Sequence, residues 1–357
     1  MAGKLKIAVL YEPSDNVTPP ERERRGKREK GASIRGRKHE RRAKLDRDEV
    51  LEAVRENGHD AFFHELKDEK SLLDLAAVEA DLVFNLTEAY AGDDSKEAHV
   101  AAFLDLLALP YTGAGPQALF PAQDKALAKK VFTFHGIRTP NFASSYRGKI
   151  DHMDDLEFPL IVKPASEDGS VGIDAGSVVK SVKELMERVA LLHDRFECPV
   201  LIEEFIEGRE IYVGVLGSDK PEALPPVEMD LSKLPKGMPR IAGTEVKWEK
   251  GTEAYDATRS AVAHDLPEEL GRRIQETALA AYVALGLRDY GRIDMRLAPN
   301  GDVYVIEANP NPWLASRQEF AMAARAAGRS YTELIGEIVE LAMSRYPKAG
   351  FANGAGS

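Results

Sequence analysis

Cysteine is almost absent from the sequence, and the single one, Cys198, has no second cysteine with which to form an intramolecular disulfide. The eight histidines show no close metal-ligand spacing with it, so no zinc site of the cysteine-histidine type is indicated. A reducing compartment is the simplest interpretation of this composition.

Long hydrophobic runs are missing as well. No segment approaches the roughly 20 apolar residues that are needed to cross a bilayer. Residues 1–12 lead into a predicted strand without a hydrophobic segment of signal-peptide length. We therefore expect a cytoplasmic protein that does not contact a membrane.

Positive charge is in deficit, because 59 acidic residues exceed 48 lysines and arginines and give a formal net charge of -11. Residues 20–47 depart from this pattern, since basic side chains predominate there and almost no large apolar residue accompanies them. Three interpretations of this basic insertion stay open: an exposed structural insertion, a lid that attracts an anionic substrate, or a nucleic-acid contact. No aromatic residues are interleaved to stack on bases, which makes nucleic-acid binding unlikely.

The residues that are present predict two styles of architecture. With 357 residues, of which 43% are hydrophobic, the chain is long enough for two or three domains. Strands at residues 5–10, 61–64 and 82–86 alternate with helices at 46–57 and 71–79, an order that predicts an open parallel sheet. Beyond Pro140, short strands at 160–163, 200–204 and 211–216 indicate an α+β region with antiparallel strands. Further helices are predicted at residues 97–107, 123–135, 267–285 and 331–344.

The most informative segment is a predicted β-hairpin at residues 292–308. Asn300-Gly301 is a strong signal for a two-residue turn between strands at 292–297 and 303–308. In that register, residues whose numbers sum to 601 lie opposite each other. Asp294 then faces Glu307 and Arg292 faces Asn309, with all four side chains on one side of the ribbon.

Two carboxylates directly across neighbouring strands would have β-carbons about 5 Å apart and would repel each other. A bound divalent cation removes this repulsion, and the oxygens of Asp, Glu and an amide are ligands that suit magnesium. The alternatives are a solvated acidic edge of the hairpin, or a register that is shifted by one residue.

Two further segments have the character of a nucleotide site. Residues 160–164 form an apolar strand with Lys163 near its end, and the glycine-bearing loop 165–173 follows, whose backbone amides can bind phosphate oxygens. The lysine precedes the glycines, so this is not a Walker A loop. Residues 200–212 form two strands joined by a short acidic linker, where backbone groups can bind an adenine edge and Glu210 can accept from ribose hydroxyls. Taken alone, each segment also fits an ordinary β-connection.

In this order, the strand IVKPA, the glycine loop, the linker EEFI, the strand GRID and the strand EAN resemble the ATP-grasp superfamily, and within it the D-alanine-D-alanine ligases. The resemblance covers residues 110–343. It implies an ATP-grasp fold, in which two α+β lobes clamp ATP behind an N-terminal domain with an open parallel sheet. The implied domains are residues 1–122 with the basic insertion, the small lobe 123–200, and the large lobe 201–357 with the metal hairpin.

The resemblance also implies roles by motif position. The implied catalytic residues are Arg292, which stabilises charge on the reacting carboxylate, and Ser170, which closes over the phosphates with the neighbouring amides. The implied ATP-binding residues are Lys125 and Lys163 for the phosphates, and Glu203, Glu204, Phe205, Ile206 and Glu210 for adenine and ribose. The implied ligands of two Mg²⁺ ions, for which Mn²⁺ can substitute, are Asp294, Glu307 and Asn309.

The implied activity is the ATP-dependent joining of a carboxylate to an amine through an acyl phosphate, with an amino acid or a small peptide as substrate. The chain departs from the ligase pattern at the substrate end, where Trp313 replaces a glycine and Glu12 is the candidate for holding an amino group. Candidate lids against water are residues 167–172 and 242–265, the second of which contains Lys247 and Trp248. The resemblance further implies a homodimer. The alternative is a non-catalytic ATP-binding or nucleic-acid-associated module on the same fold.

Overall fold

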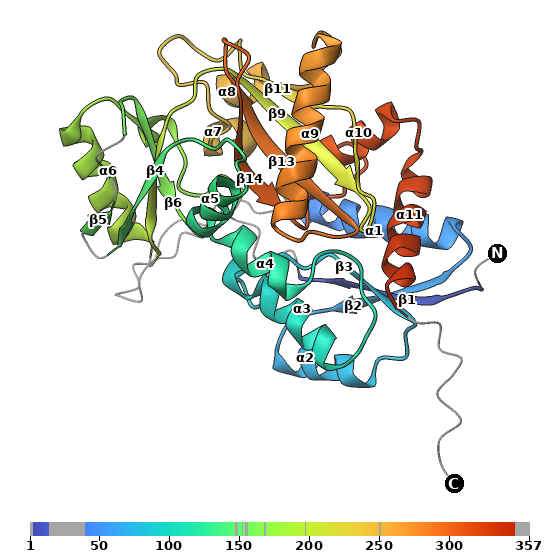
Figure 1. Cartoon of the computed structure of the whole chain (residues 1–357). Coiled ribbons are helices and arrows are strands. Elements are labelled where there is room, and N and C mark those ends of the chain that lie inside the picture. Colours follow the sequence, from blue (N-terminus) through green and yellow to red (C-terminus); the bar gives the residue numbers. More distant parts are fainter. Residues whose placement is uncertain are drawn as a thin grey trace.

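The structure, a computed structural model, describes residues 3–13, 40–146, 149–151, 153, 156–167, 169–196, 198–249 and 251–346. Three β-sheets organise these residues, and each occupies a different part of the molecule (Figure 1). Most of the predicted basic insertion, residues 20–39, lies outside the described residues, so its three interpretations stay predictions. The domain boundaries drawn from the sequence also stay predictions.

The first sheet is parallel and has the strand order β2-β1-β3. Residues 7–10 of the central strand are fully buried, as expected for a strand that is covered on both faces. The predicted parallel sheet is confirmed by the pairing of β1 with both neighbours. Its strands and connections are β1 (Lys6–Tyr11), α1 (Glu40–Glu56), β2 (Asp60–Glu65), α2 (Glu69–Asp74), a 3₁₀ turn (Leu75–Ala77) and β3 (Leu82–Asn85).

The second sheet has six strands, in the order β12-β11-β9-β13-β14 with β10 beside β9. Along β9 (Arg209–Leu216), Ile211, Val213 and Val215 belong to the core beneath α9 (Glu268–Ala284), whereas Tyr212 and Leu216 pack with α10 (Glu319–Ala326). This two-residue alternation gives the sheet two covered faces. The other strands are β10 (Glu222–Ala223), β11 (Val227–Asp230), β12 (Arg259–Val262), β13 (Tyr290–Leu297) and β14 (Val303–Asn309).

The third sheet is smaller and antiparallel, with the order β5-β4-β8-β6-β7, and stands at the left of Figure 1. Helix α6 (Val182–Arg195) covers one face of it. The sequence analysis does not predict α6, although Ser181 caps it by accepting a hydrogen bond from the Glu184 amide, and Ser-x-x-Glu is a recognised start signal. The strands are β4 (Phe142–Tyr146), β5 (Lys149–Asp151), β6 (Leu160–Pro164), β7 (Val178–Val179) and β8 (Val200–Glu204).

The remaining α-helices lie between and around the sheets. The sequence pattern predicts a loop at α4, but Pro116 occupies its first position, where a helix does not need the missing N–H group. Among the described residues, no helix is long and apolar enough to cross a membrane. These helices are α3 (Glu97–Leu106), α4 (Pro116–Gln123), α5 (Lys125–Phe134), α7 (Thr244–Lys247), α8 (Glu253–Ala257) and α11 (Tyr331–Ser344).

The turn of the metal hairpin differs from the predicted one. The Ala298 amide donates to the Asp302 carbonyl, so three residues and not two form the turn, and Gly301 takes a φ of 86°. Next to this turn, the numbers of opposed residues therefore sum to 600 and not to the predicted 601.

A β-bulge between the turn and the predicted metal ligands removes this offset of one residue. Ile306 is an extra residue in β14, because Met295 pairs with Val305 while Asp294 pairs with Glu307. The predicted pairing of the two carboxylates is confirmed, since the longer turn and the bulge cancel each other.

A buried aspartate joins the first sheet region, the large sheet and the C-terminal helix. The Asp289 side chain is fully buried and accepts hydrogen bonds from the Gly113 amide at 2.8 Å and the Ser218 hydroxyl at 3.1 Å. Arg345, just after α11, donates to both carboxylate oxygens at 2.9 and 2.7 Å and also to the Tyr111 carbonyl. A buried carboxylate is stable only while such partners are in place.

We expect Arg345→Met to lower the free energy of unfolding by about 3 kcal/mol, because it leaves the Asp289 carboxylate buried without its cation. Urea denaturation of the purified protein measures this change. The matched control is Arg272→Met, whose ion pairs with Glu269 and Glu276 are exposed and should contribute little to stability. Equal effects of the two substitutions would contradict the role of Asp289 as a buried joint.

Candidate active site

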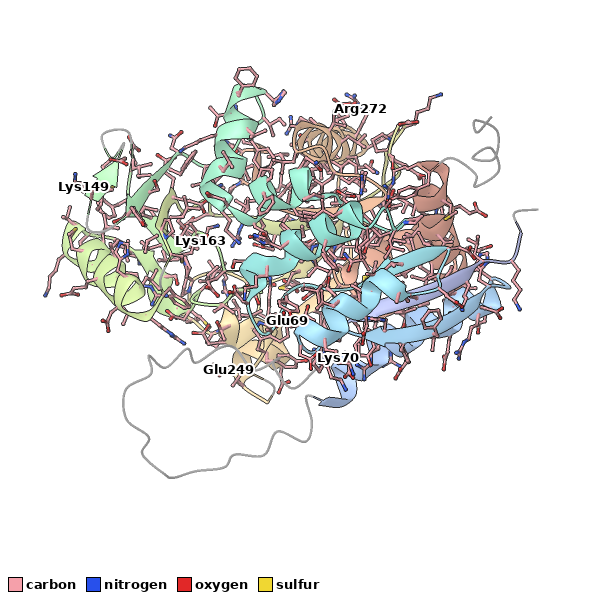
Figure 2. All side chains as sticks on the ribbon, turned by 90° about the horizontal axis from the view of Figure 1, so that it is seen from below. Glu69, Lys70, Lys149, Lys163, Glu249 and Arg272 are labelled. Atoms are coloured by element: carbon pink, nitrogen blue, oxygen red, sulfur yellow. The ribbon has the colours of Figure 1, made fainter. Side chains whose placement is uncertain are left out.

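An open cavity lies between the small sheet and the large sheet. Figure 2 shows Lys163 in the interior of the molecule, whereas Lys149 and Arg272 lie at its edges. The predicted site residues that line the cavity are Lys163, Ser170, Glu203, Glu204, Phe205, Ile206, Glu210 and Glu307. Lys125 adjoins them, since its Nζ lies 3.5 Å from Glu307 Oε2.

Glu203 has different partners from those that the resemblance implies. Its carboxylate lies between two lysines, with Lys129 Nζ at 2.7 Å from one oxygen and Lys163 Nζ at 2.8 Å from the other. All three side chains are buried. The Glu203 carboxylate therefore holds the phosphate-side lysines, and the adenine contact predicted for it is not supported by its position.

Lys129 belongs to this cluster, although it is not among the site residues that the sequence predicts. Burial lowers its pKa to about 8, although the charge of Glu203 opposes this shift. Its Nζ also lies 2.7 Å from the Thr139 hydroxyl, which donates to the Val305 carbonyl on β14 at 2.8 Å. The available signal was its spacing, because Lys125 and Lys129 are four residues apart and so share one face of α5.

Two backbone amides of the linker between β8 and β9 are already hydrogen bonded within the protein. The Glu204 amide donates to the Asn141 carbonyl and the Phe205 amide to the Pro159 carbonyl. These two amides are therefore not available to adenine. The predicted backbone contacts with adenine are left to the Ile206 amide and the neighbouring carbonyls.

Glu210 lines the cavity and is fixed there by an arginine. Arg296 Nε lies 2.8 Å from Glu210 Oε2, and Arg296 also donates to the Gly208 carbonyl at 3.0 Å. Arg296 is buried and lines the same cavity, and the sequence analysis does not single it out. The ion pair with Arg296 thus holds the Glu210 carboxylate in the cavity, where the prediction requires an acceptor for ribose hydroxyls.

The predicted metal ligands lie together on β13 and β14. Burial raises the pKa of Asp294 despite the neighbouring guanidinium of Arg292, and the charge of Glu307 adds to the rise. Burial also acts to raise the pKa of Glu307, but Lys125, Lys163 and Lys247 together hold it below its ordinary value. Arg292 is therefore the main cation beside Asp294, and lysines are the main cations beside Glu307.

The donor set at this place fits magnesium. Asn309 follows Glu307 on β14, and its amide nitrogen is buried without a hydrogen-bond partner among the described residues. No three His, Cys, Asp or Glu side chains are placed to hold a metal in the described part of the chain, so the donors here are two carboxylates and one amide. Magnesium commonly takes only one or two protein carboxylates and completes its shell with water and phosphate oxygens.

Arg292 lies beside the metal ligands, as the hairpin register predicts. Its Nε and Nη2 donate to the two oxygens of Asp294 at 2.7 and 2.9 Å, and its guanidinium stacks over the Tyr212 ring at 4.9 Å. Such a planar, two-point contact fixes the orientation of the guanidinium.

The two candidate lids contact each other. The Ser170 hydroxyl donates to the Ala242 carbonyl at 2.7 Å, the Thr244 hydroxyl donates to the Ser170 carbonyl at 3.0 Å, and the Trp248 indole donates to the Gly169 carbonyl at 2.7 Å. Residue 168 of the first lid lies outside the described residues. Lys247, from the second lid, lines the cavity. The two segments thus form one cover, in which the Ser170 hydroxyl is used to hold the cover together.

The two predicted substrate residues lie outside the cavity lining and hold loops of the N-terminal region. Glu12 accepts hydrogen bonds from the Glu88 and Ala89 amides, and burial raises its pKa to about 8. The Trp313 side chain is hydrogen bonded to Asp46 within α1. Both residues remain predictions as substrate contacts.

The chain is similar to known proteins over most of its length. A family model described as "D-ala D-ala ligase C-terminus" matches residues 126–340. The D-alanine-D-alanine ligase of Bordetella petrii is 35% identical over 274 residues, which cover 76% of this chain and 78% of that protein. The uncharacterized protein y4sG of Sinorhizobium fredii is 33% identical over 316 residues, with coverage of 86% and 89%.

The fold is also found among solved structures. The D-alanine-D-alanine ligase from Bacillus anthracis, in a crystal structure complexed with ATP, superposes with a TM-score of 0.70 at 24% identity. The match covers 96% of this chain and 98% of that chain. The predicted ATP-grasp fold is thereby confirmed.

We expect Trp248→Phe to open the cover, because it removes the hydrogen bond to Gly169 and keeps an aromatic ring. A bond of about 1 kcal/mol corresponds to an open population that is raised about fivefold. Hydrogen-deuterium exchange of the amides in residues 169–172 measures this change. Trp313→Phe is the matched control, since its indole bonds elsewhere, and faster exchange at 169–172 in both variants would contradict the assignment.

Proposed function

The chain belongs to the D-alanine-D-alanine ligase family of ATP-grasp enzymes, and from this premise we propose that Asp294, Glu307 and Asn309 form the metal centre at which it joins a carboxylate to an amine. It is an ATP-dependent ligase that forms C–N bonds. The observation that carries the site assignment is the facing of Asp294 and Glu307 beside a cavity with several lysines. Magnesium, when bound, neutralises the triphosphate and so favours phosphoryl transfer.

The first step of the proposed reaction makes an acyl phosphate. An oxygen of the substrate carboxylate attacks the γ-phosphorus of ATP, and ADP leaves with the electrons of the broken P–O bond. Lys125, Lys163 and Lys247 are the cations that lower the pKa of Glu307 most, and Lys163 and Lys247 line the cavity, so we assign these lysines to the phosphates. Glu203 keeps Lys163 in position through its buried ion pair.

The second step makes the amide bond. An amine attacks the acyl carbon, a tetrahedral oxyanion forms, and inorganic phosphate leaves while the amine loses a proton. Arg292 supplies the positive charge for this oxyanion, in an orientation that Asp294 and Tyr212 fix. The joined cover of residues 169–172 and 242–248 excludes water, which would hydrolyse the acyl phosphate.

The substrates proposed are amino acids or small peptides, and D-alanine is not assigned. Trp313 fills space that a glycine would leave open, which supports a substrate pose unlike that of the relatives. Glu12 remains the candidate for an amino group, and a homodimer remains a prediction. No observation in the described residues favours the alternative of a non-catalytic module.

We expect phosphate release from ATP to depend on an added carboxylate. A panel of amino acids and dipeptides, assayed with and without hydroxylamine, tests this, because hydroxylamine converts an acyl phosphate to a stable hydroxamate. A substrate carboxylate should give both phosphate and hydroxamate. ATP turnover that ignores every added carboxylate would contradict the proposed reaction.

We expect Glu307→Gln to abolish ligation, because an amide cannot supply the charge that a carboxylate gives to the metal centre. The metal-free protein should unfold at a slightly lower temperature, because the lysines lose a favourable partner while the cost of burying a charged carboxylate is removed. Glu69→Gln, an exposed position that Figure 2 labels at the start of α2, is the control for both measurements. A large loss of stability in Glu307→Gln would make this residue structural.

A further inference from the structure

Arg292 lies between two carboxylates, and only one of them belongs to the proposed metal centre. Within the described residues, its guanidinium donates hydrogen bonds to Asp294 through Nε and Nη2. On its other edge, Nη1 lies 3.9 Å from Glu319 Oε2, too far for a hydrogen bond but close enough for a strong electrostatic attraction. The three side chains are mostly shielded from water, with 15% of Arg292, 4% of Asp294 and 14% of Glu319 exposed.

Glu319 is held firmly at this place. It is the first residue of α10, where the positive end of the helix dipole favours a carboxylate. Its Oε1 accepts a hydrogen bond of 2.8 Å from the Ser260 hydroxyl on β12. The next residue, Phe320, is buried against the sheet and anchors the start of the helix.

The approach of α10 depends on a glycine opposite Arg292. Gly214 on β9 pairs with Arg292 on β13, and a β-carbon at position 214 would lie only 3.0 Å from the Phe320 ring. A side chain at position 214 would therefore push α10, and Glu319 with it, away from the guanidinium. The local sequence thus brings Glu319 to Arg292.

Asp294 has two roles that compete. In the structure each of its oxygens accepts one hydrogen bond from Arg292, and a second lone pair on the same oxygens would have to serve the metal. A metal ion beside Asp294 draws on the same negative charge and repels the guanidinium. A second anion beside Arg292 therefore offsets the attraction to Asp294 that the buried guanidinium loses when a metal binds.

We propose that Glu319 is a positioning residue that retains the Arg292 guanidinium when magnesium engages Asp294. The inference rests on the proposed function of the metal centre. Glu319 touches neither the metal nor the reacting atoms in this assignment. It keeps Arg292 oriented for the oxyanion, and it lowers the cost of separating Arg292 from Asp294.

The simpler explanation is that Glu319 is an acidic residue at a helix N-terminus and only stabilises α10. That role predicts a small change in unfolding and no change in metal affinity. The proposed role predicts weaker metal binding without Glu319, because Asp294 is then the only carboxylate available to Arg292 and the metal must displace it.

The test is the binding of Mn²⁺ to the full-length protein in the presence of ADP, followed by the electron paramagnetic resonance signal of free Mn²⁺ and without any turnover. We expect Glu319→Gln to raise the Mn²⁺ midpoint about five- to twentyfold, the usual size of coupling between two sites. Ser260→Ala, which loosens Glu319 without removing its charge, should raise the midpoint by a smaller factor. Glu319→Asp should restore part of the loss.

The matched control is Glu268→Gln, because Glu268 is also the first residue of a helix, α9, and is exposed. Its Mn²⁺ midpoint should equal that of the wild type. An unchanged midpoint in both Glu319→Gln and Ser260→Ala, with normal thermal unfolding, would overturn the inference. If the wild type itself does not bind Mn²⁺ with ADP, the proposed metal centre fails and not only the role of Glu319.

Discussion

The structure depends on holding two mutually repelling carboxylates, Asp294 and Glu307, face to face in a buried hairpin. The backbone pairing of β13 and β14 fixes their separation, so the repulsion cannot be relieved by side-chain motion alone. Different cations offset it on the two sides. Arg292 from the same strand compensates Asp294, and lysines from other elements compensate Glu307. This division leaves the site anionic enough for a metal and still compatible with a stable fold.

The lysines are tied to the metal strand by a chain of contacts that crosses between the lobes. Lys163 pairs with Glu203, Glu203 pairs with Lys129, and Lys129 contacts Thr139, whose hydroxyl donates to the backbone of β14 at Val305. Val305 directly precedes the bulge that turns Glu307 to its position. The groups predicted to bind phosphate and the groups predicted to bind metal are therefore parts of one connected polar network that joins the small sheet to β14.

The sequence predicts those features that depend on local patterns. The parallel sheet follows from alternating strands and helices, and the helix Tyr331–Ser344 has the bounds that its periodicity indicates. The facing of Asp294 and Glu307 is predicted for a partly wrong reason, since neither the three-residue turn nor the extra Ile306 has a clear sequence signal. The Glu203 ion pairs and the contact between Ser170 and Ala242 join residues that are distant in the chain, and such pairs are decided by packing.

The role of the predicted substrate residues is harder to infer from the sequence, because these residues make contacts between segments that are distant in the chain. Trp313 is hydrogen bonded to Asp46 of α1, a carboxylate whose pKa burial raises to about 8. Asn311, two residues earlier, donates to the Thr87 carbonyl and accepts from the Tyr290 hydroxyl. A glycine at position 313 would therefore open space, and it would also leave the buried Asp46 carboxylate without its hydrogen bond from Trp313. The departure from the ligase pattern at Trp313 is thus coupled to residues of the N-terminal region, so a comparison made residue by residue cannot transfer the substrate of a relative to this chain.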